Sequence, residues 1–412
     1  MIRTSGGLPL GRRIAYWRSR RGMSQQVFAD RLGKSKSWVE KVERGVRTVD
    51  RYSVLREIAH VLEIDVHVLL AQAPGQQVAG SSSGGVDRAM IEAIRATLTV
   101  PAEFGQRPSG VPDQDKLSQD VAHAWMSLAR AGYDSLLRSL PRLIRDGHWV
   151  RADRHDDLAA ALLGEVYQIT ADVLRRVGEH HLAWLAADRA VLVSADGGDP
   201  LLTARAAVPL AEAVRAAGRP RHAVELAMTM VHRLTTSPDA RGGGAKGTNR
   251  RRLTGTLMLQ AAMGAARTTD VASTRKLLGQ AAHVAKQVGD DPEDRYRTWF
   301  GPALVDIVRF AAAVALGRGR AARARLDELA NRPDYEQLPA AIRAAHLIEV
   351  ARAHLQAGDP TAAGNALLDA ARIAPAEVRV RPLARTTLAA VLRRTDRPGP
   401  VTRLAEIVGV TV

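Results

Sequence analysis

The sequence predicts an all-α protein built from a small N-terminal domain and a longer array of helices. Apolar residues recur at helical spacing, and nothing indicates a β-rich domain. Hydrophobic residues form 46% of the 412-residue chain but aromatic residues only 4%, which favours many interfaces between helices rich in Ala, Leu and Val. A glycine turn followed by an alanine recurs in the second half, as in helical repeats. This length suggests two or three domains with a large buried core.

The clearest local pattern is the twenty-residue segment QQVFADRLGKSKSWVEKVER, residues 25–44. Ala29 has only a methyl group where two helices would cross, and Gly33 can take the left-handed conformation that ends the first helix. Val39 and Val42 form the face of the second helix that would pack on the core. The pattern predicts a helix-turn-helix. The polar residues of the second helix share the opposite face, which would enter a DNA groove; they are Lys36, Ser37, Glu40, Lys41 and Arg44.

Capping residues predict three further helices around this pair, which together make a five-helix domain over residues 8–71. In chain order, Gly22 closes a helix over residues 11–21, Ser24 caps the second helix, residues 35–37 begin the third, Asp50 caps residues 51–62 and Asp65 caps residues 66–70.

These motifs resemble the Cro/repressor-like helix-turn-helix family, also called the xenobiotic-response-element family, from about Leu10 to Leu70. The resemblance implies that Arg18 and Glu43 join the first helix to the third as a salt bridge. It leaves open whether Trp38 touches a thymine methyl group or packs on a neighbouring helix. It also implies the DNA contacts: Gln25 on a phosphate, Lys36, Ser37 and Lys41 at base edges, and Arg44 and Arg47 near the backbone.

The charge distribution supports DNA as a partner. Residues 1–71 contain 14 Lys and Arg against 7 Asp and Glu, whereas residues 72–412 contain 45 against 36. Positive charge is therefore densest where a phosphate backbone would bind. A charge-rich helix can also be a merely solvated face, but the combination of spacing and charge favours DNA.

The composition also excludes several classes of site and indicates a compartment. The chain has no cysteine, which excludes disulfides, iron–sulfur clusters, Cys-ligated zinc and thiol redox sensing. The first residues lack an apolar stretch of signal-peptide length, and the apolar run 304–316 is interrupted by Asp306 and Arg309. We therefore expect a cytoplasmic protein associated with the nucleoid.

Residues 72–115 are expected to form a flexible linker that contains one short helix. Residues 73–85, APGQQVAGSSSGG, have no apolar periodicity. Asp87 can cap a helix over residues 87–98, and a loop rich in Pro and Gly follows. The apolar stripe of that helix is Met90, Ile91, Ile94 and Leu98. The sequence leaves open whether this stripe packs on its own C-terminal domain or on a second subunit.

Residues 116–412 are expected to form an α-solenoid of helical hairpins. A Gly-x4-Ala step recurs as Gly178/Ala183, Gly218/Ala223, Gly317/Ala322 and Gly358/Ala363. Thr269 lies in the equivalent turn of another copy, and three copies carry a further alanine, at Ala190, Ala281 and Ala370. The pattern resembles tetratricopeptide repeats, although intervals of about 40 residues exceed the 34 of that consensus. The insertion SPDARGGGAKGTNRRR, residues 237–252, is expected to be an exposed loop.

The whole chain also resembles a group of bacterial regulators that join such a DNA-binding domain to a tetratricopeptide-like half. The segments that carry this resemblance are HLAWLAADRAV, GTLMLQAAMGAAR, TWFGPALVDI and ARIAPAEVR. The resemblance implies a transcriptional regulator whose C-terminal half dimerises and senses a signal.

Other chemistry has little support. Gly242, Gly244 and Gly247 spell G-x-G-x-x-G, but no strand precedes them and the Gly-Lys-Ser/Thr end of a phosphate-binding loop is missing. His180 and His181 are adjacent and so diverge on a helix, and no HExxH or comparable metal spacing occurs. No nucleophile has an assigned base. We therefore expect no enzymatic activity, no metal and no cofactor.

Two functions remain for the C-terminal half. As a signal receptor, it would bind a peptide or small molecule on a concave surface and change the separation of the DNA-binding heads. As a scaffold without a small-molecule ligand, it would only dimerise or hold another protein. The candidate ligand residues are rare aromatics and nearby arginines, namely Tyr167, Trp184, Arg189, Arg297, Trp299 and Phe300. These aromatics could equally fill gaps between alanine-rich helices.

The expected partners follow from these assignments. A homodimer would read an inverted repeat in double-stranded DNA with two recognition helices about 34 Å apart. A signalling peptide, a small molecule or another protein would bind the C-terminal half, and no membrane partner is expected.

Overall fold

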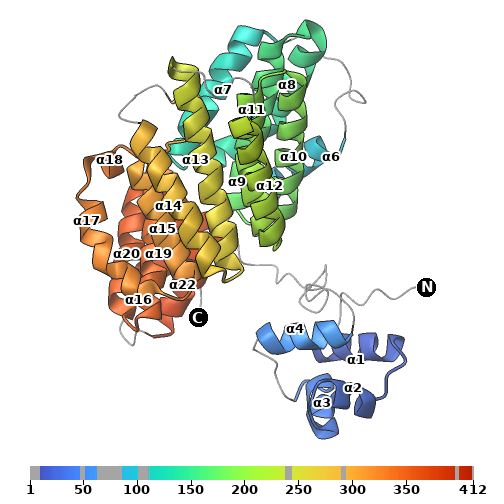
Figure 1. The fold of residues 1–412 in the computed structure, drawn as a ribbon. Coiled ribbons are helices and arrows are strands. Elements are labelled where there is room, and N and C mark those ends of the chain that lie inside the picture. Colours follow the sequence, from blue (N-terminus) through green and yellow to red (C-terminus); the bar gives the residue numbers. More distant parts are fainter. Residues whose placement is uncertain are drawn as a thin grey trace. The chain divides into compact units, whose positions relative to one another are not determined.

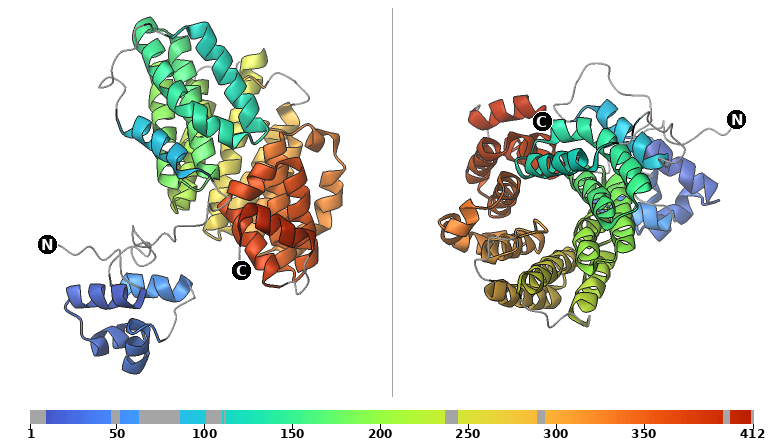
Figure 2. Two further views of the ribbon diagram at one scale, coloured as in Figure 1. Left: turned by 180° about the vertical axis from the view of Figure 1, so that it is seen from behind. Right: turned by 90° about the horizontal axis from the view of Figure 1, so that it is seen from above.

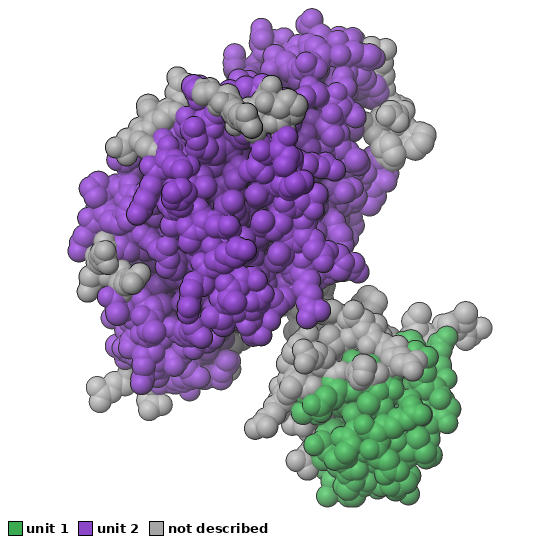
Figure 3. Space-filling view, in the orientation of Figure 1, with its two compact units in different colours: residues 1–82 green, residues 83–412 purple. Residues whose placement is uncertain are grey.

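The structure, a computed structural model, describes residues 10–46, 52–62, 86–100, 110, 112–236, 244–288, 294–394 and 399–410. Every regular element in these ranges is a helix, which confirms the expected all-α fold. The chain divides into two compact units, residues 1–82 and 83–412 (Figure 3). Within the described ranges, none of the helices combines the length and apolar composition that a membrane crossing requires.

The N-terminal unit places four described helices around one small core (Figure 1). They are α1 (Leu10–Arg20), α2 (Gln25–Arg31), α3 (Lys36–Glu43) and α4 (Tyr52–Val61). Ser24 and Ser35 cap α2 and α3 as expected, because their hydroxyls accept the backbone N–H groups of Val27 and Trp38. The core contains Ile14, Phe28, Ala29, Val39, Val42, Ile58 and Leu62. The fifth helix expected over residues 66–70 lies outside the described residues.

Glycines fix the turns and one close approach in this unit. Gly33 has φ of +61°, the left-handed conformation that the sequence predicts for it, and Gly22, predicted to close the first helix, has φ of +66°. Gly11 lies where α1 meets the end of α3, and a Cβ there would stand 2.1 Å from the carbonyl oxygen of Val42. Only glycine therefore fits at this crossing, a role that the sequence pattern did not reveal.

The C-terminal unit is an α-solenoid of antiparallel, tetratricopeptide-like hairpins (Figure 1). Its helices are α6 (Arg88–Thr99), α7 (Gln114–Ala129), α8 (Tyr133–Arg154), α9 (Asp157–Arg176), α10 (His180–Asp196), α11 (Pro200–Ala216), α12 (Pro220–Thr236), α13 (Gly244–Arg267), α14 (Val271–Val288), α15 (Pro302–Ala315), α16 (Gly319–Ala322), η4 (Arg323–Arg325), α17 (Leu326–Ala330), α18 (Pro333–Glu336), α19 (Ala340–Gln356), α20 (Pro360–Ile373), α21 (Pro375–Val380), α22 (Pro382–Leu392) and α23 (Pro400–Val408). Consecutive long helices pack on one another, as α9 packs on α8 and α10.

Each copy of the predicted repeat has a residue with positive φ at its hairpin turn. Four glycines and one threonine have positive φ at the hairpin turns: Gly178, Gly218, Thr269, Gly317 and Gly358. Six of the seven alanines that follow are buried: Ala183, Ala190, Ala223, Ala281, Ala363 and Ala370. Ala322, which follows Gly317, is only half-buried. A left-handed residue ends one helix, and a methyl side chain lets the next helix approach closely.

Helix α6 is the helix expected over residues 87–98. Asp87 caps it by accepting the backbone N–H of Ala89 at 2.9 Å. Its buried side chains are Ile91, Ile94 and Leu98, and they join the core of the C-terminal unit beside α8 and α10. The apolar stripe therefore packs within its own chain, which the sequence left open.

The prediction of an exposed loop over residues 237–252 is wrong for its second half. Residues 244–252 form the first turns of α13, and Asn249, Arg250 and Arg252 are buried. The polar and glycine-rich composition is typical of a loop, but α13 packs against α11, α12, α14 and α15. Tertiary packing on several sides therefore outweighs the low helix propensity of this segment.

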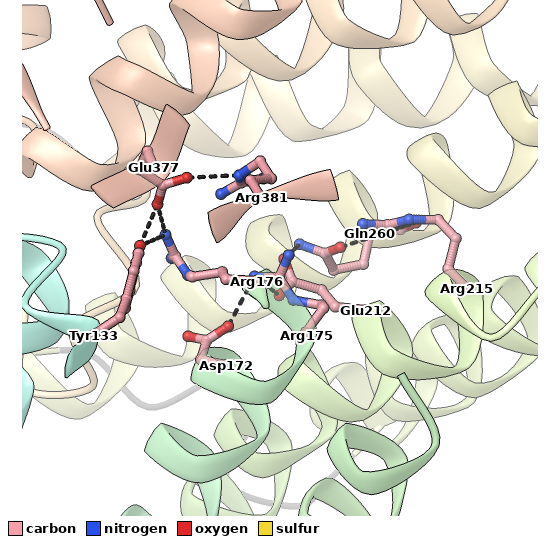
Figure 4. Close-up of polar contacts among 9 residues, drawn as sticks. All are labelled: Tyr133, Asp172, Arg175, Arg176, Glu212, Arg215, Gln260, Glu377 and Arg381. Atoms are coloured by element: carbon pink, nitrogen blue, oxygen red, sulfur yellow. Dashed lines mark hydrogen bonds and ion pairs between the residues drawn. The ribbon is translucent and has the colours of Figure 1, made fainter. Parts of the chain in front are cut away.

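The solenoid curves until helices near its two ends meet (Figure 2, right). Helix α7 contacts α19, and the start of α8 lies beside α21. Glu377 of α21 is completely buried and accepts hydrogen bonds from the hydroxyl of Tyr133 and from the guanidinium of Arg176 (Figure 4). The Nε–H of Arg381 donates to its other oxygen at 2.6 Å. One carboxylate thus joins α8, α9 and the C-terminal helices.

The two arginines keep this buried carboxylate ionised. Burial by itself favours the neutral acid, but the charges of Arg381 and Arg176 outweigh burial and lower the pKa of Glu377 to about 2. Burial raises the pKa of Tyr133, whose hydroxyl stays a donor to the carboxylate. The contact between the two ends of the solenoid therefore depends on a negative charge at Glu377.

We expect Glu377→Gln to lower the free energy of unfolding of the C-terminal unit by about 3–5 kcal/mol at neutral pH, because two arginines lose their charge partner. The pKa of Glu377 is lower in the folded chain than the ordinary 4.5. Its stabilising contribution is thus present above pH 4.5 and is lost as the pH falls towards 2. Denaturant unfolding of residues 83–412, followed by circular dichroism across this range, measures both effects.

Asp369→Asn is the matched control, because the ion pair of Asp369 with Arg372 is exposed and should contribute about 0–1 kcal/mol. A Glu377→Gln variant with the stability and pH dependence of the unmodified protein would contradict the role assigned to this carboxylate.

Candidate nucleic-acid interface and cavity

Helix α3 lies with its apolar face on the core and its polar face in solvent. Val39 and Val42 are 1% and 3% exposed, and residues three apart share one face of a helix. The left-handed Gly33 turns the chain from α2 into α3, so that the N-terminal end of α3 is free at the surface. The side chains that the resemblance places near DNA are exposed on the opposite face: Lys36, Ser37, Lys41 and Arg44.

The basic side chains on this face make only weak interactions within the protein. Lys36 Nζ lies 4.0 Å from Glu40 Oε1, one turn away, and both side chains are exposed. Arg44 Nε donates to the carbonyl oxygen of Glu40 at 3.4 Å. Exposed pairs of this kind contribute little, so these cations can turn to another anion at small cost.

Two other expected DNA contacts differ in their surroundings. Trp38 is half-buried and packs against the core of the N-terminal unit, which is one of the two placements that the resemblance left open. Arg47 lies outside the described residues.

Glu43 connects three helix ends beneath this face. Arg18 of α1 donates to it from Nε at 2.6 Å and from a terminal nitrogen at 3.1 Å, which confirms the expected salt bridge. A second terminal nitrogen of Arg18 donates to the carbonyl oxygen of Met23 at 2.6 Å. Gln25, expected at a DNA phosphate, donates its amide to Glu43 at 2.7 Å. Glu43 therefore fixes α3 against both α1 and α2.

A cavity of about 680 Å³ lies inside the C-terminal unit. Helices α7, α9, α11, α13, α15 and α19 line it, together with the segment 294–299. Its wall is mostly apolar, with Leu, Val, Ala, Pro, Met and Trp side chains, but it also contains eight charged residues. Those charged residues are Arg130, Asp172, Arg175, Arg176, Arg205, Glu212, Asp294 and Arg297.

Four of these charged residues, Asp172, Arg175, Arg176 and Glu212, take part in the polar contacts drawn in Figure 4. Arg175 lies between Asp172 at 2.8 Å and Glu212 at 3.0 Å. Gln260 donates to Glu212 at 3.1 Å and accepts from Arg215 at 2.7 Å. Burial lowers the pKa of Arg215 to about 10, because no carboxylate in the described chain pairs with it directly.

The six candidate ligand residues do not form one site. Arg297 and Trp299 line the cavity, whereas Tyr167 and Phe300 are core residues, 1% and 5% exposed. The Tyr167 hydroxyl lies 2.6 Å from His148 Nε2. Arg189 stacks over the ring of Tyr167, Trp184 lies under Arg219, and neither Arg189 nor Trp184 lines the cavity. Only Arg297 and Trp299 therefore remain candidates for this cavity.

Sequence reasoning missed the residues at the centre of the cavity, above all Trp125 and Arg205. A signal was present for Arg205, which lies seven residues before Glu212 in a helix otherwise rich in Ala, Leu and Val. Two charges on the same face of an apolar helix indicate a polar interior. Trp125 gave no comparable signal, because a single tryptophan on a helix is usually part of a core.

Residues 9–72 match a family of helix-turn-helix domains. The chain is 33% identical over 61 residues to the HTH-type transcriptional regulator SinR of Bacillus subtilis and, to the same extent, to SinR of Bacillus licheniformis. Each match covers 15% of this chain and 55% of the relative, so the chain spans about half the length of these curated relatives. The N-terminal unit is therefore a helix-turn-helix domain.

Among solved structures, the chain is similar to Bacillus thuringiensis PlcR in complex with the peptide PapR7 and DNA. The similarity covers 79% of this chain and 99% of PlcR, at 12% sequence identity and a TM-score of 0.33.

We expect Glu43→Gln to lower the melting temperature of the N-terminal unit without DNA, because Arg18 keeps a neutral partner in place of a charged one. Each kcal/mol lost from the free energy of unfolding should lower the melting temperature by roughly 4–8 °C in a domain of this size. Thermal melting of residues 1–82, followed by circular dichroism, measures the effect. Glu40→Gln makes the same chemical change on the exposed face of α3 and should leave the melting temperature nearly unchanged. Equal melting temperatures for the two variants would remove the structural role of Glu43.

Proposed function

We propose that the protein is a sequence-specific, DNA-binding transcriptional regulator and that α3 is its recognition helix. The observation that supports this best is the face of α3 that carries Lys36, Ser37, Lys41 and Arg44, exposed on a helix-turn-helix domain. The excess of Lys and Arg over Asp and Glu in residues 1–71 adds the electrostatic attraction that binding to phosphates needs. We assign the domain to the Cro/repressor-like family on the motifs quoted above.

The proposed contacts divide between bases and backbone. Lys36, Ser37 and Lys41 lie at the start and middle of α3, where a helix in the major groove reaches base edges. Arg44 and Arg47 follow the helix and are assigned to phosphates, which orient the domain without reading sequence. Gln25, at the start of α2, is assigned to a phosphate beside its bond to Glu43.

The C-terminal unit is proposed to dimerise the chain and to carry regulation. A small domain has little surface left for a stable dimer interface once its core is formed, whereas a solenoid offers long apolar edges. Two helix-turn-helix domains held by such a dimer would read an inverted repeat. A peptide or small molecule bound to the solenoid would change how far apart, or how freely, these domains sit.

We expect Lys36→Ala and Lys41→Ala to weaken binding to the operator more than to random DNA, by roughly 1–3 kcal/mol, because they remove base contacts. Arg47→Ala should weaken binding to the operator and to random DNA equally. Gel shifts with an operator selected from a random DNA pool measure the difference. Lys276→Ala removes the same charge from an exposed position on α14 and is the control. Equal losses on both DNAs would reassign the two lysines to the phosphate backbone.

We expect residues 1–82 alone to be monomeric with weak operator affinity, and residues 83–412 alone to be dimeric without DNA binding. Light scattering and gel shifts on the two fragments test this division. A dimeric N-terminal fragment with full operator affinity would refute it and would favour the C-terminal unit as a scaffold for another protein.

A further inference from the structure

Arg205 is a buried cation without a counterion. It projects from α11 and is 8% exposed, and its Nε–H donates to the carbonyl oxygen of Tyr296 at 2.7 Å. In the part of the chain that the structure describes, it forms no ion pair, and its two terminal NH2 groups have no hydrogen-bond partner. Burial lowers the pKa of Arg205, because carboxylates compensate its charge only from a distance. A buried guanidinium in this state is costly unless an anion joins it.

Three other arginines that line the cavity have carboxylate partners. Arg215, which has none in the described chain, donates to Gln260 and does not line the cavity. Arg175 is paired with Asp172 and Glu212, and Arg176 is paired with Glu377. Arg297 is paired with Glu165 at 3.1 Å. The uncompensated charge inside the cavity is thus centred on Arg205. Its terminal NH2 groups offer the parallel donors that a carboxylate or another oxyanion accepts.

An aromatic surface lies beside this cation. The guanidinium of Arg205 is 5.1 Å from the centre of the Trp125 ring, and that of Arg297 is 5.5 Å from the same ring. The indole N–H of Trp125 donates to Glu165 at 2.5 Å, which fixes the ring. Further along the wall, Trp299 and Met126 are 42% and 52% exposed. Large apolar side chains left exposed at a cavity indicate that an apolar body packs there.

The loop that carries Trp299 is held in an unfavourable conformation. Arg297 and Trp299 have φ of +50° and +55°, the left-handed region that residues with a side chain rarely adopt. Asp294 holds the turn, because it accepts the backbone N–H of Trp299 at 2.6 Å and the hydroxyl of Thr298 at 3.1 Å. Backbone strain of this kind concentrates at binding sites, where it fixes side chains in advance.

We propose that the cavity binds a small organic anion with an apolar body: its acidic group pairs with Arg205, and its body packs against Trp125 and Trp299. The volume of about 680 Å³ is in the range of cavities for single small molecules. The acidic group is a carboxylate, sulfonate or phosphate ester, since all present oxygens to a guanidinium. This ligand class rests on the proposed regulatory role of the C-terminal unit and makes it specific.

Two fluorescent probes of the same shape test the proposal on the full chain. The first is 1-anilinonaphthalene-8-sulfonate, an anion with an aromatic body, and the second is N-phenyl-1-naphthylamine, which lacks the sulfonate. We expect the anion to bind with one saturable site per chain and more tightly than the neutral probe. Arg205→Gln should lower the affinity for the anionic probe roughly tenfold or more and the affinity for the neutral probe little, because only the charged hydrogen bonds are lost. Arg205→Lys, which keeps the positive charge, should retain part of the preference for the anionic probe over the neutral one.

Arg219→Gln is the matched control, since Arg219 also stacks on a tryptophan, Trp184, but lies away from the cavity. It should leave the binding of both probes unchanged. Equal binding of the two probes, or an equal loss of both in Arg205→Gln, would overturn the assignment of an anion site. Displacement of the anionic probe by inorganic phosphate alone at equal concentration would overturn the requirement for an apolar body.

Operator gel shifts on the same proteins separate this proposal from the proposed function. Arg205→Gln without ligand should bind the operator as the unmodified protein does. If the anionic probe fails to bind while operator binding is intact, the ligand assignment is wrong and the DNA-binding function stands.

Discussion

Close packing at small side chains is the constraint on which the C-terminal unit depends. Ala183, Ala223 and Ala363 are buried without any exposed surface, because each lies where a helix crosses its neighbour after a hairpin turn. A methyl group at the crossing lets neighbouring helices approach closely, so the hairpins stack on one another. The solenoid bends far enough that its two ends meet, and the cavity lies inside that bend.

Both units use a buried glutamate to join helices that are far apart in the sequence. Glu43 holds Arg18 and Gln25, and Glu377 holds Arg176 and Tyr133 as well as Arg381. A buried carboxylate is stable only with several donors, so each site fixes the position of every helix that contributes one. In the first unit this fixes α3 against α1 and α2, and in the second it connects the ends of the solenoid.

The cavity shows the opposite arrangement. Arg205 is more deeply buried than Arg175, but Arg175 has two carboxylates and Arg205 has none beside it in the described chain. The two arginines therefore differ in role. The paired arginine stabilises the fold, and the unpaired one lowers stability unless an anion binds. An uncompensated charge in a cavity that also contains the strained residue Trp299 is typical of a site shaped for a ligand.

The sequence by itself determined what depends on neighbours along the chain. Helix faces, caps and left-handed turns follow from local spacing, so the outward face of α3, Gly33 and even Thr269 were assigned correctly. Only the tertiary structure decided which distant segments meet. It made residues 244–252 the start of α13, a helix that packs on four others, and it brought Arg205 to Trp125 across 80 positions of sequence. Burial and charge compensation are properties of that packing, and no periodic pattern encodes them.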